Sequence, residues 1–289
     1  MLWAYWKPFG MRARLDALLV ERGLADSRIQ AESLIAAGKI WAGGQPATKA
    51  AMMVSPEIHL VLQEEPSWVS RGAFKLLRAL EAFSLSPLGA YCLDVGASTG
   101  GFTEVLLRHG ARKVVAVDVG YGQLAWSLRT DPRVDVRERT NARSLVRENF
   151  SELFSFIVVD ASFISLRLLI PPLEKLLTPD GHMVLLVKPQ FEAGRERVGK
   201  GGVVRDPALH VTILQEVLSF VGEKSFLVTQ GLAVSPLKGP EGNLEFLLWL
   251  MFAGQGREHR VHEQMVRDVV TSAHAPESNL CQECGETCP

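Results

Sequence analysis

Four charged residues lie at or beside the ends of apolar segments of this chain. They are Lys75, Asp160, Lys188 and Glu245, in the stretches Ser70–Leu76, Val158–Ala161, Leu186–Pro189 and Asn243–Glu245. Two lysines and two acids that meet at one site could orient each other. Burial beside a second cation could also leave one amine neutral enough to accept a proton. For any one of these residues alone, a surface salt bridge is the favoured explanation, but the four together after a glycine turn indicate an acid–base site.

A glycine-rich turn, Leu93–Phe102, precedes the apolar stretch Val114–Asp118. Its glycines let the backbone approach a ligand closely, and the helix that follows offers free N–H groups to a carboxylate. Asp118 ends the strand expected over residues 114–118, about twenty residues beyond the turn. An acid at this place can accept hydrogen bonds from ribose hydroxyls. The spacing is not Gly-x-Gly-x-x-Gly, so it argues against a dinucleotide and favours S-adenosylmethionine. The alternative is an ordinary glycine-rich βα turn that binds no nucleotide.

Strands and helices alternate from Ser70 onward, which predicts a parallel sheet with helices on both faces. The predicted fold class is α/β, with a Rossmann-like sheet and a smaller N-terminal α/β unit. Strands are expected near 91–95, 114–118, 134–137, 156–160, 182–188, 225–231 and 244–250, and helices over Ala73–Phe83 and near 208–221. Ligands of such sheets bind beyond the carboxyl ends of the strands, where Asp160 and Lys188 fall.

The small N-terminal unit is expected over residues 12–62. Leu15, Leu18 and Leu19 share one face of a first helix, which Gly23 ends. Ser27 and Gln30 form the capping box of a second helix. The predicted boundaries give residues 1–11 as an extension of unassigned role, 63–69 as a linker, 70–253 as the larger domain and 254–289 as a disordered tail.

Composition limits the partners and the compartment. The net charge is −1, so any surface that binds nucleic acid must be local. No apolar run approaches the ~18 residues that span a bilayer, and no signal peptide is recognisable, which favours a cytoplasmic protein without a membrane partner. Cys281, Cys284 and Cys288 supply three thiols, one short of a closed zinc site, so we predict no metal unless His274 or another chain completes it.

The stretches Leu15–Ala25, Ser70–Leu76, Asp94–Gly101 and Lys188–Gly194 carry a family resemblance. Residues 12 to about 250 resemble the TlyA, or haemolysin A, family of ribosomal RNA 2′-O-methyltransferases. In that family an S4-type RNA-binding domain precedes an FtsJ-like methyltransferase domain. The resemblance implies a catalytic tetrad at Lys75, Asp160, Lys188 and Glu245. It also implies S-adenosylmethionine as cofactor, ribosomal RNA or ribosomal subunits as partner, and a cytidine 2′-hydroxyl as acceptor.

The expected binding residues follow from the turn, the strand ends and the local basic groups. Cofactor contacts are expected from Asp94, Gly96, Ser98, Thr99, Gly100, Gly101, Phe102, Asp118, Asn141 and Asp160. RNA contacts are expected from Arg12, Arg14, Arg28, Lys39, Lys49, Arg71, Arg195, Lys200 and Arg205. The last three lie in a glycine-rich basic loop, residues 194–206, which could close on RNA or could simply be solvated.

The tetrad has a division of labour in this reaction. A ribose hydroxyl must lose its proton as it attacks a sulfonium methyl group, and Lys188 is the expected base. Asp160 would orient Lys188, Lys75 would hold the hydroxyl or a phosphate, and Glu245 would position a lysine. Three other functions stay open: a membrane-active haemolysin, a non-catalytic RNA-binding protein and a small-molecule methyltransferase. The sequence indicates no oligomeric state.

Overall fold

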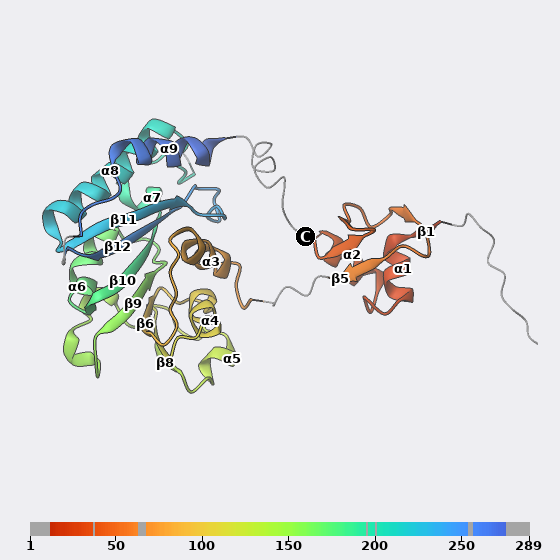
Figure 1. Ribbon diagram of the computed structural model, residues 1–289, viewed down its shortest axis with the longest axis horizontal. Helices are drawn as coiled ribbons and strands as arrows, with labels where there is room; N and C mark the ends of the chain where they lie inside the picture. Colours follow the sequence, from red (N-terminus) through yellow and green to blue (C-terminus); the bar gives the residue numbers. More distant parts are fainter. Residues whose placement is uncertain are drawn as a thin grey trace, which may run out of the picture. The chain divides into compact units, whose positions relative to one another are not determined.

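Two compact units make up the protein, Met1–Ser67 and Trp68–Pro289 (Figure 1). The structure is a computed structural model that describes residues 12–36, 38–62, 68–194, 196–199, 201–253 and 257–275. The predicted extension, residues 1–11, therefore lies outside the described residues, as do residues 63–67 of the predicted linker. Each unit has a hydrophobic core of its own.

The N-terminal unit builds its core from short elements. They are β1 (Ala13–Arg14), α1 (Leu15–Glu21), α2 (Arg28–Ala36), β2 (Ile40–Ala42), β3 (Gln45–Pro46), β4 (Met53–Val54) and β5 (Leu60–Leu62). Strands β3, β2 and β5 form one small sheet, and β1 pairs with β4. Leu15 and Leu19 of α1 are fully buried with Ile40 of β2. The apolar helical face that the sequence predicts thus packs on a sheet.

The second unit contains the central sheet. Its strands are β6 (Tyr91–Val95), β7 (Lys113–Val117), β8 (Val134–Arg137), β9 (Phe154–Val159), β10 (Leu177–Val187), β11 (Leu227–Val234) and β12 (Phe246–Phe252). Its helices are α3 (Ala73–Ala82), α4 (Gly101–Arg108), α5 (Trp126–Arg129), α6 (Ile170–Glu174), α7 (Pro189–Glu192), α8 (Pro207–Lys224) and α9 (Glu263–His274), with 3-10 turns η1 (Ala142–Ser144), η2 (Arg147–Asn149) and η3 (Leu166–Leu168). The strand order is β11-β12-β10-β9-β6-β7-β8.

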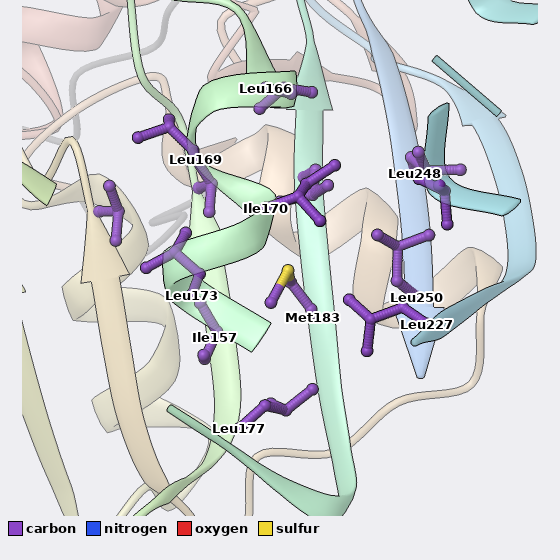
Figure 2. Packing of buried hydrophobic residues seen from close by; sticks show 14 of the residues in the cluster. Ile157, Leu166, Leu169, Ile170, Leu173, Leu177, Met183, Leu227, Leu248 and Leu250 are labelled. Atoms are coloured by element: carbon purple, nitrogen blue, oxygen red, sulfur yellow. The ribbon is translucent and has the colours of Figure 1, made fainter. Parts of the chain in front are cut away.

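Helices cover both faces of this sheet (Figure 1). One core joins the sheet to α6, α8 and α9, and Figure 2 shows its centre, where Ile157 and Met183 meet Ile170 and Leu173. The other core joins the opposite face to α3, α4 and α5. Successive residues of a strand point to opposite faces, so near-continuous apolar strands such as Phe154–Val159 are needed when both faces are covered. The predicted α/β class with a Rossmann-like sheet is confirmed.

The sheet is not wholly parallel, contrary to the sequence prediction. β12 lies between β10 and β11 and runs antiparallel to both. A parallel pair needs a crossover connection, usually through a helix, and the chain has only the loop 235–245 between β11 and β12. The loop returns the chain in a hairpin, so β12 begins at the edge where β9 and β10 end.

Two predicted boundaries are wrong, and the first is the start of the larger domain at residue 70. Trp68 and Val69, assigned to the linker, pack on α4: Val69 N–H donates to Glu104 Oε2 at 2.7 Å, and the Arg108 guanidinium lies 4.4 Å from the Trp68 ring centre.

The predicted disordered tail contains α9, because Val266 and Val270 are one helical turn apart and bury the same face in the core. None of the described helices combines the length and apolarity that a bilayer crossing requires.

Candidate active site

The four charged residues singled out by the sequence meet in one cavity of about 600 Å³. Lys75 lies in the first turn of α3, and Glu245 directly precedes β12. Asp160 and Lys188 directly follow β9 and β10. The ends of these parallel strands and the start of antiparallel β12 share one edge of the sheet, which is why residues so distant in sequence converge.

A continuous chain of ion pairs links the four side chains. Lys75 Nζ lies 2.7 Å from Glu245 Oε2 and 3.8 Å from Asp160 Oδ2. Lys188 Nζ lies 2.6 Å from Asp160 Oδ1. Asp160 is the most exposed of the four at 20%, and Glu245 the most buried at 2%. Opposite charges attract more strongly away from bulk water, so these contacts hold both amines and both carboxylates in place.

Glu245 illustrates the electrostatic balance of the cavity. Burial raises its pKa above the ordinary value, because a charged carboxylate loses its hydration there. The ammonium group of Lys75 opposes this rise. The lysine that Glu245 positions is therefore Lys75, whereas Asp160 lies between the two lysines.

Lys188 has a second partner that the sequence analysis missed. Its Nζ donates to Ser162 Oγ at 2.8 Å, in addition to its contact with Asp160. Both acceptors lie on the loop that follows β9, so the position of this loop fixes the direction of the amine. Ser162 is two residues beyond a charged strand end, and its place just past that strand end was the available signal.

The glycines of the turn Leu93–Phe102 let neighbouring elements approach. Gly96 has φ +85°, and a Cβ there would lie 2.5 Å from the carbonyl oxygen of Asp160. A Cβ on Gly101 would lie 2.9 Å from the backbone nitrogen of Ala73, at the start of α3. Real Cβ atoms do not come this close to backbone atoms. The turn is therefore in direct contact with the segments that carry Asp160 and Lys75.

A second cavity of about 310 Å³ adjoins the first and shares the wall formed by Gly96, Ser98, Asp160 and Ser162. Asp118 and Asn141 line it. Asp118 Oδ2 accepts the N–H of Ser98 at 2.8 Å, and Oδ1 accepts that of Gly120 at 2.6 Å. A carboxylate has about four acceptor positions, so Asp118 can also take two ribose hydroxyls. The donor set therefore suits a nucleoside beside the tetrad.

Most of the expected cofactor residues border the two cavities. Gly96, Ser98, Thr99, Gly101, Phe102, Asp118, Asn141 and Asp160 line one or the other. Asp94 and Gly100 line neither. The Asp94 side chain is fully buried and accepts the Thr103 hydroxyl at 2.6 Å, and burial raises its pKa to about 7. Asp94 thus lies behind the turn, facing α4, and does not reach the cavity.

Residues 68–252, which include both cavities, match the family of FtsJ-like methyltransferases. The chain belongs to the FtsJ-like methyltransferase family. Residues 13–57 match the S4 domain, so this methyltransferase carries an S4 unit before its catalytic domain. Both matches confirm the domain types that the resemblance implies.

Relatives of this methyltransferase extend over nearly its whole length. The 16S/23S rRNA (cytidine-2'-O)-methyltransferase TlyA of Mycobacterium tuberculosis is 52% identical over 259 residues, 87% of this chain and 96% of the relative. Hemolysin A of Brachyspira hyodysenteriae is 40% identical over 81% of this chain and 98% of its own. A solved structure described as a hemolysin from Streptococcus thermophilus has 40% identity and a TM-score of 0.69, covering 91% of this chain and 96% of that one. The predicted resemblance to the TlyA family is confirmed.

The expected RNA-binding residues have different surroundings. Arg12, Lys49, Arg71 and Arg205 are exposed, and Lys39 is half-buried. Arg71 also lines the tetrad cavity, as does Lys238, which the sequence analysis missed. Arg195 and Lys200 lie outside the described residues. Exposed cations at the rim of the cavity are suitably placed for phosphates beside an acceptor ribose.

Arg14 and Arg28 have a structural task in the S4 unit. Both guanidinium groups contact Asp16 Oδ2, at 2.7 and 2.9 Å, and the Asp16 side chain is fully buried. These contacts hold the pKa of Asp16 well below its usual range. The two arginines therefore satisfy a buried carboxylate, although each side chain is about half exposed and can still meet a phosphate.

The predicted cysteine cluster, Cys281, Cys284 and Cys288, lies outside the described residues. Its suggested partner His274 lies at the end of α9, with Nε2 3.1 Å from His210 Nδ1. Within the ranges that the structure describes, no three His, Cys, Asp or Glu side chains are grouped to hold a metal ion.

We expect Asp118→Ala to weaken S-adenosylmethionine binding by about 1–3 kcal/mol, or about 5- to 150-fold in Kd. The substitution removes the proposed ribose acceptor and leaves the N–H groups of Ser98 and Gly120 without their partner. Titration calorimetry measures the effect. Asp131→Ala is the matched control, because Asp131 also accepts a backbone N–H two residues ahead but lies outside both cavities. Unchanged affinity in the Asp118 variant would refute the assignment.

Proposed function

We propose that this methyltransferase transfers a methyl group from S-adenosylmethionine to a ribose 2′-hydroxyl of cytidine in ribosomal RNA. The observation that carries the proposal is the position of Asp160. It lines both cavities and holds the amine of Lys188 at 2.6 Å where they meet. A methyl donor that extends from the smaller cavity along the glycine turn into the larger one, and an acceptor in the larger cavity, would therefore meet beside the same amine.

The chain offers each part of S-adenosylmethionine a suitable partner. Asp118 and Asn141 would hold the ribose and the adenine side, and the backbone at the start of α4 would hold the carboxylate. When bound, the cofactor supplies a methyl group on a positively charged sulfur, open to attack by an oxygen. No diphosphate has to be placed, which agrees with the absence of a dinucleotide spacing in the turn.

Lys188 is the proposed base. The hydroxyl of a ribose is a weak nucleophile near neutral pH, so its proton must leave as the oxygen attacks. Lys188 would first lose a proton, and its neutral Nζ would then accept the proton of the hydroxyl. Asp160 and Ser162 would keep the nitrogen in place. Lys75, held by Glu245, would bind the acceptor hydroxyl or the phosphate next to it. Correct placement of both reactants accounts for much of the rate in such a reaction.

Ribosomal RNA is the proposed substrate for two reasons. The relatives that cover most of the chain include an enzyme named for 16S and 23S rRNA, and an S4 domain precedes the catalytic domain. Arg71 and Lys238 add two cations to a tetrad whose own charges cancel, which favours a polyanion at the larger cavity. Since ribosomes are cytoplasmic, the reaction would take place in the cytoplasm.

Transfer of tritiated methyl groups to purified ribosomal subunits tests the proposal. We expect label in RNA, at a cytidine whose 3′ phosphodiester bond resists alkali because the neighbouring 2′-oxygen is blocked. Nuclease digestion and mass spectrometry would locate the nucleotide. Label on a base instead of a ribose, or label only on small molecules added to the assay, would contradict the proposal.

Removing residues 1–67 should weaken binding to ribosomal RNA and leave cofactor binding unchanged. The cut falls before Trp68, which packs with the catalytic domain, so that domain stays complete. Filter binding at several salt concentrations measures the change, and the slope of affinity against salt should also decrease as phosphate contacts are lost. If the shortened chain methylates RNA as fast as the full one, the S4 unit does not anchor the substrate.

A further inference from the structure

A carboxylate outside the tetrad lies close to Lys188 in the chain. Glu192 is the last residue of α7, four residues after Lys188, and its side chain is 1% exposed. Glu192 Oε1 accepts the N–H of Leu166 at 2.7 Å, and Oε2 accepts the hydroxyl of Ser165 at 2.6 Å. Charge-assisted hydrogen bonds of this kind are strong, and a buried carboxylate needs them. Glu192 therefore holds one defined point of the segment that follows β9.

That segment carries both partners of Lys188. It begins at Asp160, whose N–H donates to the carbonyl of Val95 at 2.9 Å, and it ends at Ser165 and Leu166. Between these ends Phe163 has φ +62° and is 90% exposed. Positive φ is unfavourable for a phenylalanine, so contacts must keep the segment in this shape. One is made by Phe163 itself, whose ring centre lies 5.1 Å from that of Phe191 on α7. Glu192 supplies others at one end, together with the burial of Leu166 in the core (Figure 2).

An arginine stands behind the carboxylate. Arg167 Nε lies 3.9 Å from Glu192 Oε2, and its NH2 group lies 3.1 Å from Glu216. Burial raises the pKa of Glu192, and the hydrogen bonds from Ser165 and Leu166 oppose that rise. The charge of Arg167 also opposes the rise, so three neighbouring groups stabilise the ionised carboxylate against the cost of its burial.

We propose that Glu192 is a positioning residue, which holds Asp160 and Ser162 against the amine of Lys188. Lys188 and Glu192 lie at the two ends of the single turn α7. The helix that begins at the proposed base therefore also binds, through Glu192, the segment that carries the two partners of that base. Loss of these contacts would let the segment move while α7 stays in place. Misplacement of a reacting group by about 1 Å can cost about 100-fold in rate. The inference rests on the proposed methyl transfer.

The test compares Glu192→Ala with Glu192→Gln in the full chain. Alanine removes both contacts. Glutamine keeps them, because its amide oxygen can accept from Leu166 and the Ser165 hydroxyl can turn to accept from its NH2. We expect kcat for RNA methylation to fall at least about tenfold in the alanine variant and less than about threefold in the glutamine variant. With saturating cofactor, KM for RNA should stay within about twofold in both variants.

Glu174 provides a matched control. It is also buried and also accepts a serine hydroxyl, from Ser225 at 2.6 Å, and a backbone N–H, from Phe226 at 3.2 Å. These contacts lie at the start of β11, the edge of the sheet opposite the tetrad. Glu174→Ala should lower thermal stability as Glu192→Ala does, yet leave kcat unchanged. An equal loss of kcat in both variants would reduce Glu192 to a general structural role and overturn the proposal.

A double-mutant cycle with Ser162 tests how Glu192 acts. Ser162→Ala should lower kcat in the parent chain and have little further effect beside Glu192→Ala, since the hydroxyl is then already displaced. If Ser162→Ala lowers kcat by the same factor in the parent chain and in the Glu192→Ala variant, the proposal is contradicted. Ser165→Ala, which removes only one of the two contacts, should give a partial loss and replaces Glu192→Ala if that variant does not fold.

Amide hydrogen exchange gives a readout that needs no activity. The N–H of Leu166 should exchange faster in Glu192→Ala and stay protected in Glu192→Gln. Unchanged protection in the alanine variant would overturn the proposal whatever the kinetics. If the parent chain transfers no methyl group to RNA, the proposed function fails, and the exchange data still decide whether Glu192 holds this segment.

Discussion

Replacing Lys188 by alanine is expected to lower the single-turnover rate of methyl transfer at least about 1,000-fold, while RNA and cofactor still bind. The proposed base would act mainly in the transition state, where the hydroxyl proton must be taken up. Lys188→Arg should fail as well, because a guanidinium group does not lose its proton at any working pH. The measurement is single-turnover transfer with saturating RNA and cofactor.

Asp160→Ala should resemble the Lys188 variants, because Asp160 Oδ1 holds the amine at 2.6 Å. Lys113→Arg, at the start of β7, is the control for lysine-to-arginine exchange outside both cavities. Substantial transfer by Lys188→Arg would show that Lys188 contributes only a charge that holds the substrate.

Replacing Lys75 by methionine is expected to lower the free energy of unfolding by about 3–5 kcal/mol near pH 8. Glu245 would then keep a buried charge without the ammonium that lies 2.7 Å away. Denaturant unfolding followed by circular dichroism measures the loss. Transfer activity should disappear too, since Lys75 lines the cavity proposed for the acceptor.

This loss should depend on pH with a definite sign. Burial already raises the pKa of Glu245, and Lys75 opposes the rise, so removal of Lys75 raises the pKa further. A carboxyl whose folded pKa lies above its unfolded value contributes fully to stability below the unfolded value. That contribution is lost as pH rises through the folded pKa. The Lys75→Met variant should therefore be closer to wild type at pH 5 than at pH 8.

Two controls separate the buried pair from other effects. Arg78→Met breaks the exposed pair with Glu81 on the same helix and should change stability by no more than about 1 kcal/mol. Adding Glu245→Gln to Lys75→Met should restore most of the stability and remove its dependence on pH. A pH-independent loss in Lys75→Met would show that packing of the lysine stem, and not the charge of Glu245, is responsible.

The sequence was most informative where one chemical type marks one position in the fold. Asp160 and Lys188 each end an apolar run, so the ends of two parallel strands could be recognised and placed at one edge. The turn could be recognised from its glycines. The structure shows why one is needed at position 96, where a Cβ would collide with the backbone of Asp160. Local patterns of this kind report the backbone directly.

The remaining parts depend on contacts between distant segments. Ser162 and Glu192 make hydrogen bonds at the sheet edge to residues distant in sequence, and neither stands out among the many serines and glutamates of the chain. Arg14 and Arg28 looked like free cations because the burial of Asp16 is a property of the folded unit. The antiparallel direction of β12 follows from a missing crossover helix, which is visible only once the strand limits are known.

The close contacts at Gly96 and Gly101 have a genetic consequence. A methyl group at either position would displace backbone that also carries Asp160 or begins the helix of Lys75. A substitution of either glycine is therefore expected to impair the proposed donor binding and the proposed proton transfer together. Alleles that keep partial activity should be rare at these two codons. In a selection for inactive enzyme, substitutions at these codons should recur as complete losses of activity.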